Sequence, residues 1–123
     1  MVFGGIHVTS VPEEVISNSF IDYGIIGEGE STLLELLECI NNKKSPYKIK
    51  NLVYRKNNKI IKNSIRKLIE NLDSLPFPDK DIFYDFIPYA KKTYTIMTGR
   101  GCPFSCTYCF NNVYRKIYKN KGK

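Results

Sequence analysis

Three observations predict an α/β fold for this 123-residue chain. Two short apolar segments, Val2-Phe3 and Ile21 to Ile26, run into the glycine loops Gly4-Gly5 and Gly27-Glu28-Gly29. A leucine-rich helical pattern follows the second loop, and a further β-prone segment, Thr93 to Thr98, precedes another glycine loop. Strands that end at glycines and alternate with helices are typical of α/β sheets.

Local signals predict the elements before residue 42. Val2 to Thr9 is expected to be the end of a strand that runs into a turn at its two glycines. Pro12 to Ile16 is expected to form a helical turn, because proline suits the first helical position and glutamates suit the positive end of the helix dipole. In the helix after residue 29, Thr32 and Glu35 have the spacing of a capping box. The inner face of that helix is predicted to consist of Leu33, Leu34, Leu36, Leu37 and Ile40.

A hairpin is predicted beyond the polar break at residues 41–46. Ile49 to Arg55 and Lys59 to Asn63 have strand-like composition and are joined by a turn at Lys56-Asn57-Asn58. Ile65 to Leu72 fits either a short helix or an extended connector. Leu75 to Asp79 contains two prolines two residues apart, which predicts a stiff linker.

The last predicted element is a helix that begins near residue 110. It covers residues 110 to 118, and its inner face is expected to contain Val113, Ile117 and Tyr114. The segment before it, Thr93 to Thr98, is expected to be a strand that leads into the loop Gly99-Arg100-Gly101.

The charge distribution indicates more than one module. The formal net charge is +7, but the first 42 residues contain seven acidic residues and no Lys or Arg, whereas 19 basic and five acidic residues follow. The lysines are scattered among Asn and Ile, which does not favour nucleic acid as a partner. The sequence has neither a signal peptide nor an apolar stretch near the roughly 18 residues of a membrane span, so a cytoplasmic location without a membrane span is expected.

Three clustered cysteines are the sharpest functional signal. Cys102, Cys106 and Cys109 lie in a predicted loop, and in a reducing compartment thiols at this spacing indicate metal ligation better than disulfides. Three thiolates can bind three irons of a 4Fe–4S cluster and leave the fourth iron open for a ligand. A zinc site would need a fourth ligand, and Cys39 and His7 lie more than sixty residues upstream. Zinc ligation and a set of buried structural thiols are the alternatives.

The stretch from Gly99 to Cys109 resembles the CxxxCxxC signature of the radical S-adenosylmethionine (radical SAM) superfamily, including an aromatic residue, Tyr108, before the third cysteine. The resemblance implies that Cys102, Cys106 and Cys109 hold a 4Fe–4S cluster whose open iron binds S-adenosylmethionine. Reductive cleavage would then give methionine and a 5′-deoxyadenosyl radical. It also implies that Tyr108 contacts the adenine mainly through its backbone, and that the motif follows the first strand of a (β/α) barrel.

Three upstream segments resemble the cobalamin-binding subfamily of radical SAM proteins: Gly4 to Thr9, Asp22 to Glu30 and Leu72 to Pro78. The resemblance implies a Rossmann-like cobalamin domain in which the cobalamin nucleotide tail is lined by Gly4, Gly5, Gly27, Glu28 and Gly29. Glycines at the carboxyl ends of parallel strands are also where such sheets bind ligands. The predicted limits are 1–44 for the C-terminal part of this domain, 45–87 for the hairpin and linker, and 88–123 for the start of a truncated radical SAM barrel.

His7 and Cys39 receive structural interpretations. The DxHxxG motif that supplies the cobalt ligand in the subfamily does not occur, so His7 is not expected to bind cobalt. Cys39, beside the apolar stripe, is expected to be a buried small hydrophobe.

The resemblance implies an enzyme, most specifically a cobalamin-dependent methyltransferase or a relative with other radical chemistry. The expected partners are a small-molecule substrate and a flavodoxin- or ferredoxin-type electron donor. A complete barrel needs about 200 residues and 14 follow Cys109, so the chain is expected to be an internal fragment that is inactive alone. The alternatives are a tRNA-modifying methylthiotransferase-like enzyme and a non-catalytic zinc or iron–sulfur module.

Overall fold

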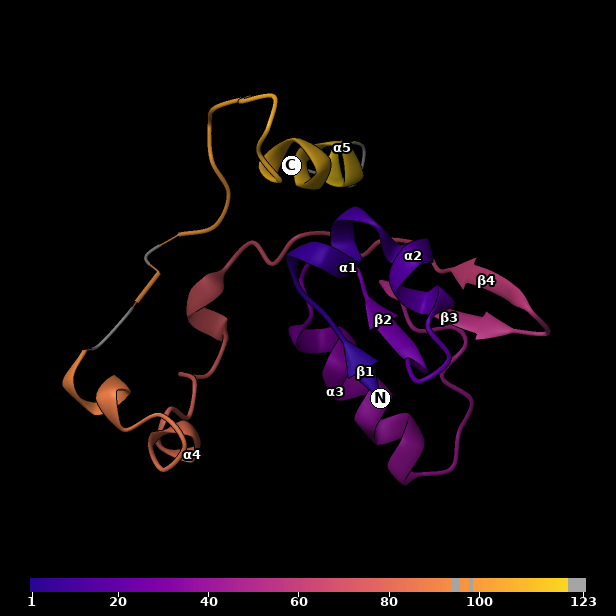
Figure 1. The fold of residues 1–123 in the computed structure, drawn as a ribbon, viewed down its shortest axis with the longest axis horizontal. Coiled ribbons are helices and arrows are strands. Elements are labelled where there is room, and N and C mark those ends of the chain that lie inside the picture. The colour runs from indigo at the N-terminus through magenta and orange to yellow at the C-terminus, as the bar shows by residue number, and fades with distance from the viewer. Residues whose placement is uncertain (94–95, 98, 120–123) are drawn as a thin grey trace. The chain divides into compact units, whose positions relative to one another are not determined.

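The computed structural model describes residues 1–93, 96–97 and 99–119 (Figure 1). The chain divides into two compact units, one formed by Met1–Ile69 with Phe104–Lys123 and the other by Glu70–Pro103. Across the described ranges, no helix combines the length and the apolar character that a membrane span requires.

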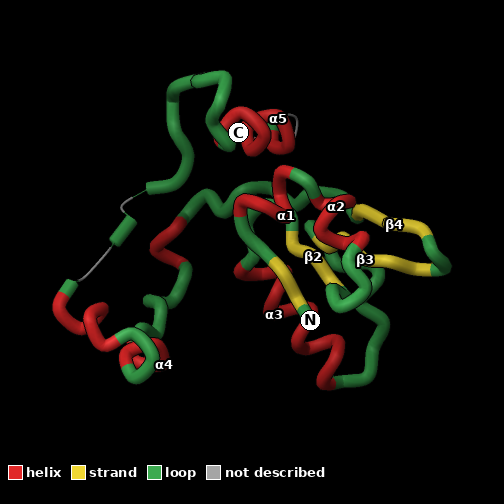
Figure 2. The backbone as a smooth tube through the Cα atoms, viewed as in Figure 1, coloured by secondary structure: helices red, strands yellow, loops and turns green. Residues whose placement is uncertain are grey.

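A four-stranded mixed sheet forms the centre of the first unit (Figure 2). Strand β1 (Val2–Phe3) pairs in parallel with β2 (Tyr23–Ile25), and β2 pairs antiparallel with β3 (Leu52–Lys56). β4 (Lys59–Lys62) completes the sheet as the antiparallel partner of β3. Together with the helices below, this sheet confirms the predicted α/β class.

Helices cover both faces of the sheet. Side chains of α1 (Ile6–Ser10) and α2 (Pro12–Ser17) pack on one face around Val53, joined by Ile117 of α5 (Asn111–Tyr118). On the other face α3 (Glu30–Asn41) buries Leu36 in a cluster with Ile25, Ile49, Leu52 and Tyr54. Successive residues of β3 thus point to opposite faces, as the pleat of a strand requires.

The sequence predicts several of these elements correctly. α2 begins with Pro12, and the strand predicted at Ile21 to Ile26 forms as β2 with both flanking isoleucines buried. The hairpin β3–β4 turns at Asn57 and Asn58, whose φ angles are 50° and 58°. A two-residue turn with two positive φ angles matches the twist of a hairpin, and asparagine tolerates that conformation.

The prediction for Val2 to Thr9 is correct for the strand end at Val2-Phe3 and for the turn at the glycines, where the chain bends at Gly5. Residues 6–10, beyond that turn, form the helix α1, which the sequence did not predict. Gly5, with a φ of 92°, redirects the chain, and the Thr9 N–H then donates to the Gly5 carbonyl. A short helix is a way to satisfy backbone groups immediately after a two-residue strand.

The predicted capping box is wrong. α3 begins at Glu30 with Gly29 as its N-cap, and no side chain caps it. The Thr32 hydroxyl instead donates to the Lys50 carbonyl at 3.1 Å, and Thr32 is fully buried. Thr32 therefore fastens α3 to the segment before β3.

The predicted inner face of α3 is only partly buried. Leu36 is completely enclosed, whereas the exposed fractions of the other four apolar residues are 42% for Leu33, 60% for Leu34, 53% for Leu37 and 52% for Ile40. Because β2 and β3 are three and five residues long, the sheet covers a single line of the helix.

The second unit contains short helices and irregular chain. A 3-10 turn at Leu72–Ser74 precedes α4 (Asp81–Tyr84), and a second 3-10 segment spans Pro88–Lys92. The predicted linker, residues 75–79, has no regular structure, and neither do residues 65–71, of which 65–69 belong to the first unit, so the short helix considered for Ile65 to Leu72 does not form. Of the predicted strand at 93–98, residues 94, 95 and 98 lie outside the described residues, and residues 93, 96 and 97 form no strand. The Rossmann and barrel descriptions and the domain limits stay predictions.

Candidate functional site

The predicted glycine residues meet at one edge of the sheet. β1 and β2 are parallel neighbours, with Val2 opposite Tyr23 and Phe3 opposite Gly24. Both strands end at the same side of the sheet, where β1 is followed by Gly4-Gly5 and β2 leads on to Gly27-Glu28-Gly29. We call these five residues the glycine edge; an edge of this kind is where α/β sheets hold ligands.

Thr9 connects the two halves of the glycine edge. Its hydroxyl donates to the Gly5 carbonyl at 2.8 Å and accepts from the Gly27 N–H at 2.9 Å. Thr9 is almost fully buried, so water does not compete strongly for these bonds. The two glycine loops are therefore held in a fixed register by one side chain on α1.

Asn51 and the connector after β4 hold Glu28 from the other side. The Asn51 side-chain amide donates to the Glu28 carbonyl at 3.1 Å, and the Ile69 N–H donates to the Glu28 carboxylate at 2.8 Å. The side-chain oxygen of Asn51 (Oδ1) accepts a hydrogen bond from the backbone N–H of Arg66 at 2.6 Å. Asn51 itself is fully buried with a φ of 64°. The Glu28 carboxylate is thus engaged by the protein's own backbone.

Tyr118 is a residue of this edge that sequence reasoning missed. Its phenol oxygen accepts a hydrogen bond from the Glu28 N–H at 3.1 Å, and its side chain is buried. A Cβ at Gly27 would lie 2.1 Å from the Tyr118 Oη. The signal that could have indicated it is the spacing of Phe110, Tyr114 and Tyr118, which share one face of a helix.

The predicted cysteine site is described in two pieces, because Cys102 belongs to one compact unit and the other two cysteines to the other. Among the described residues, none of these three cysteines forms a disulfide; Cys102 and Cys106 are exposed and Cys109 is half-buried. In the part of the chain that is described, no three Cys, His, Asp or Glu side chains form a group that could hold a metal ion. Tyr108, between Cys106 and Cys109, is 92% exposed.

α5 holds the loop that carries Cys106 and Cys109. The Cys109 N–H donates to the Cys106 carbonyl at 3.0 Å, and the Asn112 side-chain amide donates to that same carbonyl. The Asn111 amide lies 3.5 Å from the Cys109 sulfur, and Arg115 donates to the Phe104 carbonyl at 2.9 Å. Cysteine thiols with an N–H donor beside one sulfur suit soft-metal ligation, because such donors stabilise charge on a metal-bound thiolate.

Cys39 and His7, for which the sequence predicts no ligand role, are not among the residues of these sites. Cys39, which the sequence predicts to be buried, is only half-buried, and it packs against the apolar cluster under α3. His7 is exposed on α1.

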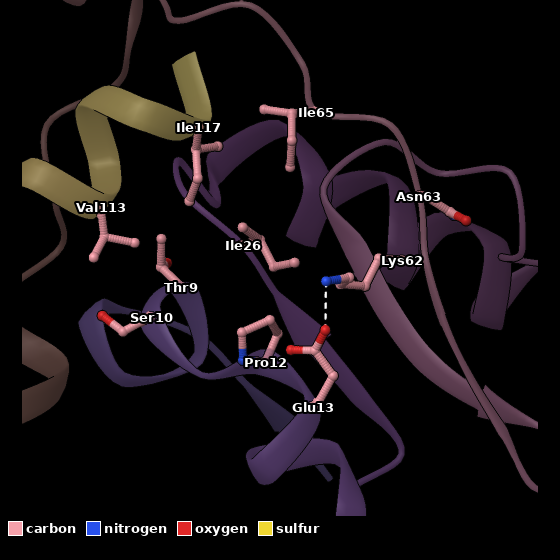
Figure 3. Close-up of a pocket in the computed structure, with 10 residues that line it drawn as sticks. All are labelled: Thr9, Ser10, Pro12, Glu13, Ile26, Lys62, Asn63, Ile65, Val113 and Ile117. Carbon is pink, nitrogen blue, oxygen red and sulfur yellow. Dashed lines mark hydrogen bonds and ion pairs between the residues drawn. The ribbon is translucent and has the colours of Figure 1, made fainter. Parts of the chain in front are cut away.

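A pocket of about 400 Å³ lies between α1, α2, the end of β4 and α5 (Figure 3). The side chains of Glu13 and Lys62 pair at its edge, and this hydrogen bond holds the pKa of the Glu13 carboxyl below its usual value. The pocket is lined by Thr9, Ser10, Pro12, Glu13, Ile26, Lys62, Asn63, Ile65, Val113 and Ile117.

A second shifted pKa belongs to Tyr23, in strand β2. Burial raises the pKa of its phenol.

Comparison with known proteins gives similarity to named enzymes. The chain is 34% identical over 120 residues to an uncharacterized methyltransferase of Pyrococcus horikoshii. The aligned region covers 92% of this chain and 25% of that protein. It is 30% identical over 126 residues to the anaerobic magnesium-protoporphyrin IX monomethyl ester cyclase of Cereibacter sphaeroides, across 96% of this chain and 20% of the cyclase. The cyclase of the same name from Synechocystis is 28% identical over 116 residues, across 89% of this chain and 22% of the cyclase.

The chain therefore spans a quarter or less of the length of these relatives. No protein-family model matches the chain, and no solved structure gives a significant match. The similarity nevertheless extends along nearly the whole chain, and the relatives are named as a methyltransferase and as cyclases.

Proposed function

We propose that this chain is part of a radical SAM enzyme in which Cys102, Cys106 and Cys109 hold a 4Fe–4S cluster. The observation that carries the proposal is the CxxxCxxC spacing of three cysteines that form no disulfide in the described part of the chain. When bound, such a cluster supplies the electron that cleaves S-adenosylmethionine into methionine and a 5′-deoxyadenosyl radical. A flavodoxin- or ferredoxin-type protein is the proposed source of that electron.

The chain's own residues have defined tasks in this proposal. The thiolates bind iron, and the Asn111 amide stabilises negative charge on the Cys109 sulfur, which lies 3.5 Å away. Asn112 and Arg115 fix the loop through bonds to its carbonyl groups, so the loop is held before a cluster is added. Tyr108 is proposed to present its backbone to the adenine of S-adenosylmethionine.

The glycine edge is the proposed site of the cobalamin nucleotide tail. Gly4 and Gly5 follow one strand, Gly27, Glu28 and Gly29 follow its parallel neighbour, and the absence of side chains at the glycines allows a ligand to approach the backbone. The proposed reaction class is cobalamin-dependent methyl transfer or related radical carbon chemistry. This proposal is consistent with relatives that are named a methyltransferase and cyclases.

Anaerobic reconstitution with iron and sulfide tests the cluster. The reduced protein is expected to give the EPR signal of a 4Fe–4S cluster, and S-adenosylmethionine is expected to shift that signal. Cys106→Ala should abolish the signal, whereas Cys39→Ala, which removes the cysteine outside the motif, should retain it. Stoichiometric zinc in place of iron, or a cluster that survives Cys106→Ala, would contradict the proposal.

A further inference from the structure

Tyr118 lies against Gly27 and Glu28 of the glycine edge. It is the last residue of α5, its side chain is 7% exposed, and its phenol oxygen accepts the hydrogen bond of the Glu28 N–H at 3.1 Å. The two residues are 90 positions apart in the sequence. An oxygen atom of the protein thus takes a backbone donor at the predicted ligand site.

The geometry of Gly27 shows how closely the ring is seated. A Cβ on Gly27 would meet the Tyr118 Oη at 2.1 Å and the Cζ at 3.0 Å, so the phenol fills the space that a side chain at this position would take. The Gly27 N–H is also engaged, because it donates to Thr9. A ligand oxygen that approaches this turn must therefore take the place of the Tyr118 hydroxyl at Glu28.

We propose that Tyr118 is a gate on the glycine edge, which binds there in place of a ligand oxygen and is displaced when a ligand enters. The inference rests on the proposed function of the glycine edge. The ligand chemistry is a phosphate or hydroxyl oxygen that accepts from the Glu28 N–H, such as an oxygen of a nucleotide tail. Because one N–H makes one well-aligned hydrogen bond, Tyr118 and the ligand compete.

The gate is connected to the cysteine loop through α5. The helix begins two residues after Cys109, and the aromatic side chains of its N-cap residue, Phe110, and of Tyr114 and Tyr118 contact one another in series. The ring centroids of Phe110 and Tyr114 are 5.7 Å apart, and those of Tyr114 and Tyr118 are 4.7 Å apart. Displacement of Tyr118 therefore frees the far end of the helix whose first residues hold the Cys106–Cys109 loop.

Corrinoid binding by the 123-residue chain and its variants tests the gate. Equilibrium dialysis against hydroxocobalamin, with the free corrinoid measured by absorbance, gives the affinity. Tyr118→Phe keeps the ring and removes the oxygen, and should raise the affinity about 2- to 10-fold, the equivalent of one hydrogen bond. Tyr118→Ala also removes the ring and should raise it further, whereas Tyr89→Ala, at an exposed tyrosine in the other compact unit, should leave it unchanged.

Two further measurements separate the possible failures. Cobinamide, which lacks the nucleotide tail, should bind equally to the native chain and to Tyr118→Phe, because the competition concerns the tail. Hydrogen exchange should show that hydroxocobalamin lowers the protection of the α5 amides. Binding that is unchanged or weaker in both Tyr118 variants, or unchanged α5 protection on binding, would overturn the gate and leave the site intact. The absence of hydroxocobalamin binding in every variant would overturn the proposed tail site and the gate with it.

Discussion

Replacement of Asn51 by alanine should strongly destabilise the first compact unit. Asn51 is fully buried, and its side chain makes hydrogen bonds to the Glu28 carbonyl and to the Arg66 N–H. Asn51→Ala removes both bonds and leaves two backbone groups without those partners. A residue with this role holds the glycine edge to the connector that follows β4, so its loss affects the fold and the proposed ligand site together.

The size of the expected loss in the free energy of unfolding on Asn51→Ala follows from two contributions. Each lost bond costs about 1–2 kcal/mol when the remaining group stays buried, which gives about 2–4 kcal/mol for the pair. The backbone φ of Asn51 is 64°, a conformation that asparagine tolerates and that costs alanine about 1 kcal/mol more. The expected loss in the free energy of unfolding is therefore about 3–5 kcal/mol. This is a large part of the stability of a small domain.

Urea unfolding of the 123-residue chain, followed by far-UV circular dichroism, measures this loss. The matched control is Asn58→Ala at the hairpin turn, an exposed position with a φ of 58°. That variant has the same backbone strain without the buried bonds, and should lose about 1 kcal/mol. If the two variants were equally stable, the buried hydrogen bonds of Asn51 would contribute nothing and the reasoning would be refuted.

Two other predictions concern the core and the pocket edge. Leu36→Ala should lower the free energy of unfolding by about 2–5 kcal/mol because Leu36 is completely buried. Leu34→Ala, at a residue that is 60% exposed, should change it by less than about 1 kcal/mol. Equal losses for the two variants in urea unfolding would contradict the assignment of Leu36 to the core. Glu13→Gln should lower the free energy of unfolding at pH 7 by less than about 1 kcal/mol, since the ion pair with Lys62 is exposed. The pKa of Glu13 is lowered in the folded chain, so this contribution is present above its usual value of 4.5 and disappears as the pH falls through the lowered value; a cost that persists at pH 2 would show another origin.

Local signals predicted the elements that depend on neighbours in the sequence. Pro12 sets the start of α2, and the Asn57-Asn58 pair sets the hairpin turn because asparagine accepts a positive φ. The meeting of the two glycine loops was also predictable, since it needs only that β1 and β2 be parallel neighbours.

Contacts between distant segments were not predictable from these signals. Thr32 fits a capping box by its spacing, yet it donates to Lys50 because β3 brings that carbonyl close. The exposed leucines of α3 follow from the short strands beneath them, which no helical period reveals. Tyr118 reaches Glu28 only because α5 packs on the same face of the sheet as α1.

The long separation between Tyr118 and Glu28 has a consequence for folding. An isolated helix of eight residues is marginal in water, so α5 depends on its docking for stability. That docking closes a loop of 90 residues, and the entropic cost of closure grows with loop length. α5 should therefore dock after the sheet has formed and undock in a local opening that costs less than global unfolding. The segment next to the cysteines is thus expected to exchange with solvent while the sheet and its Thr9 and Asn51 contacts stay folded.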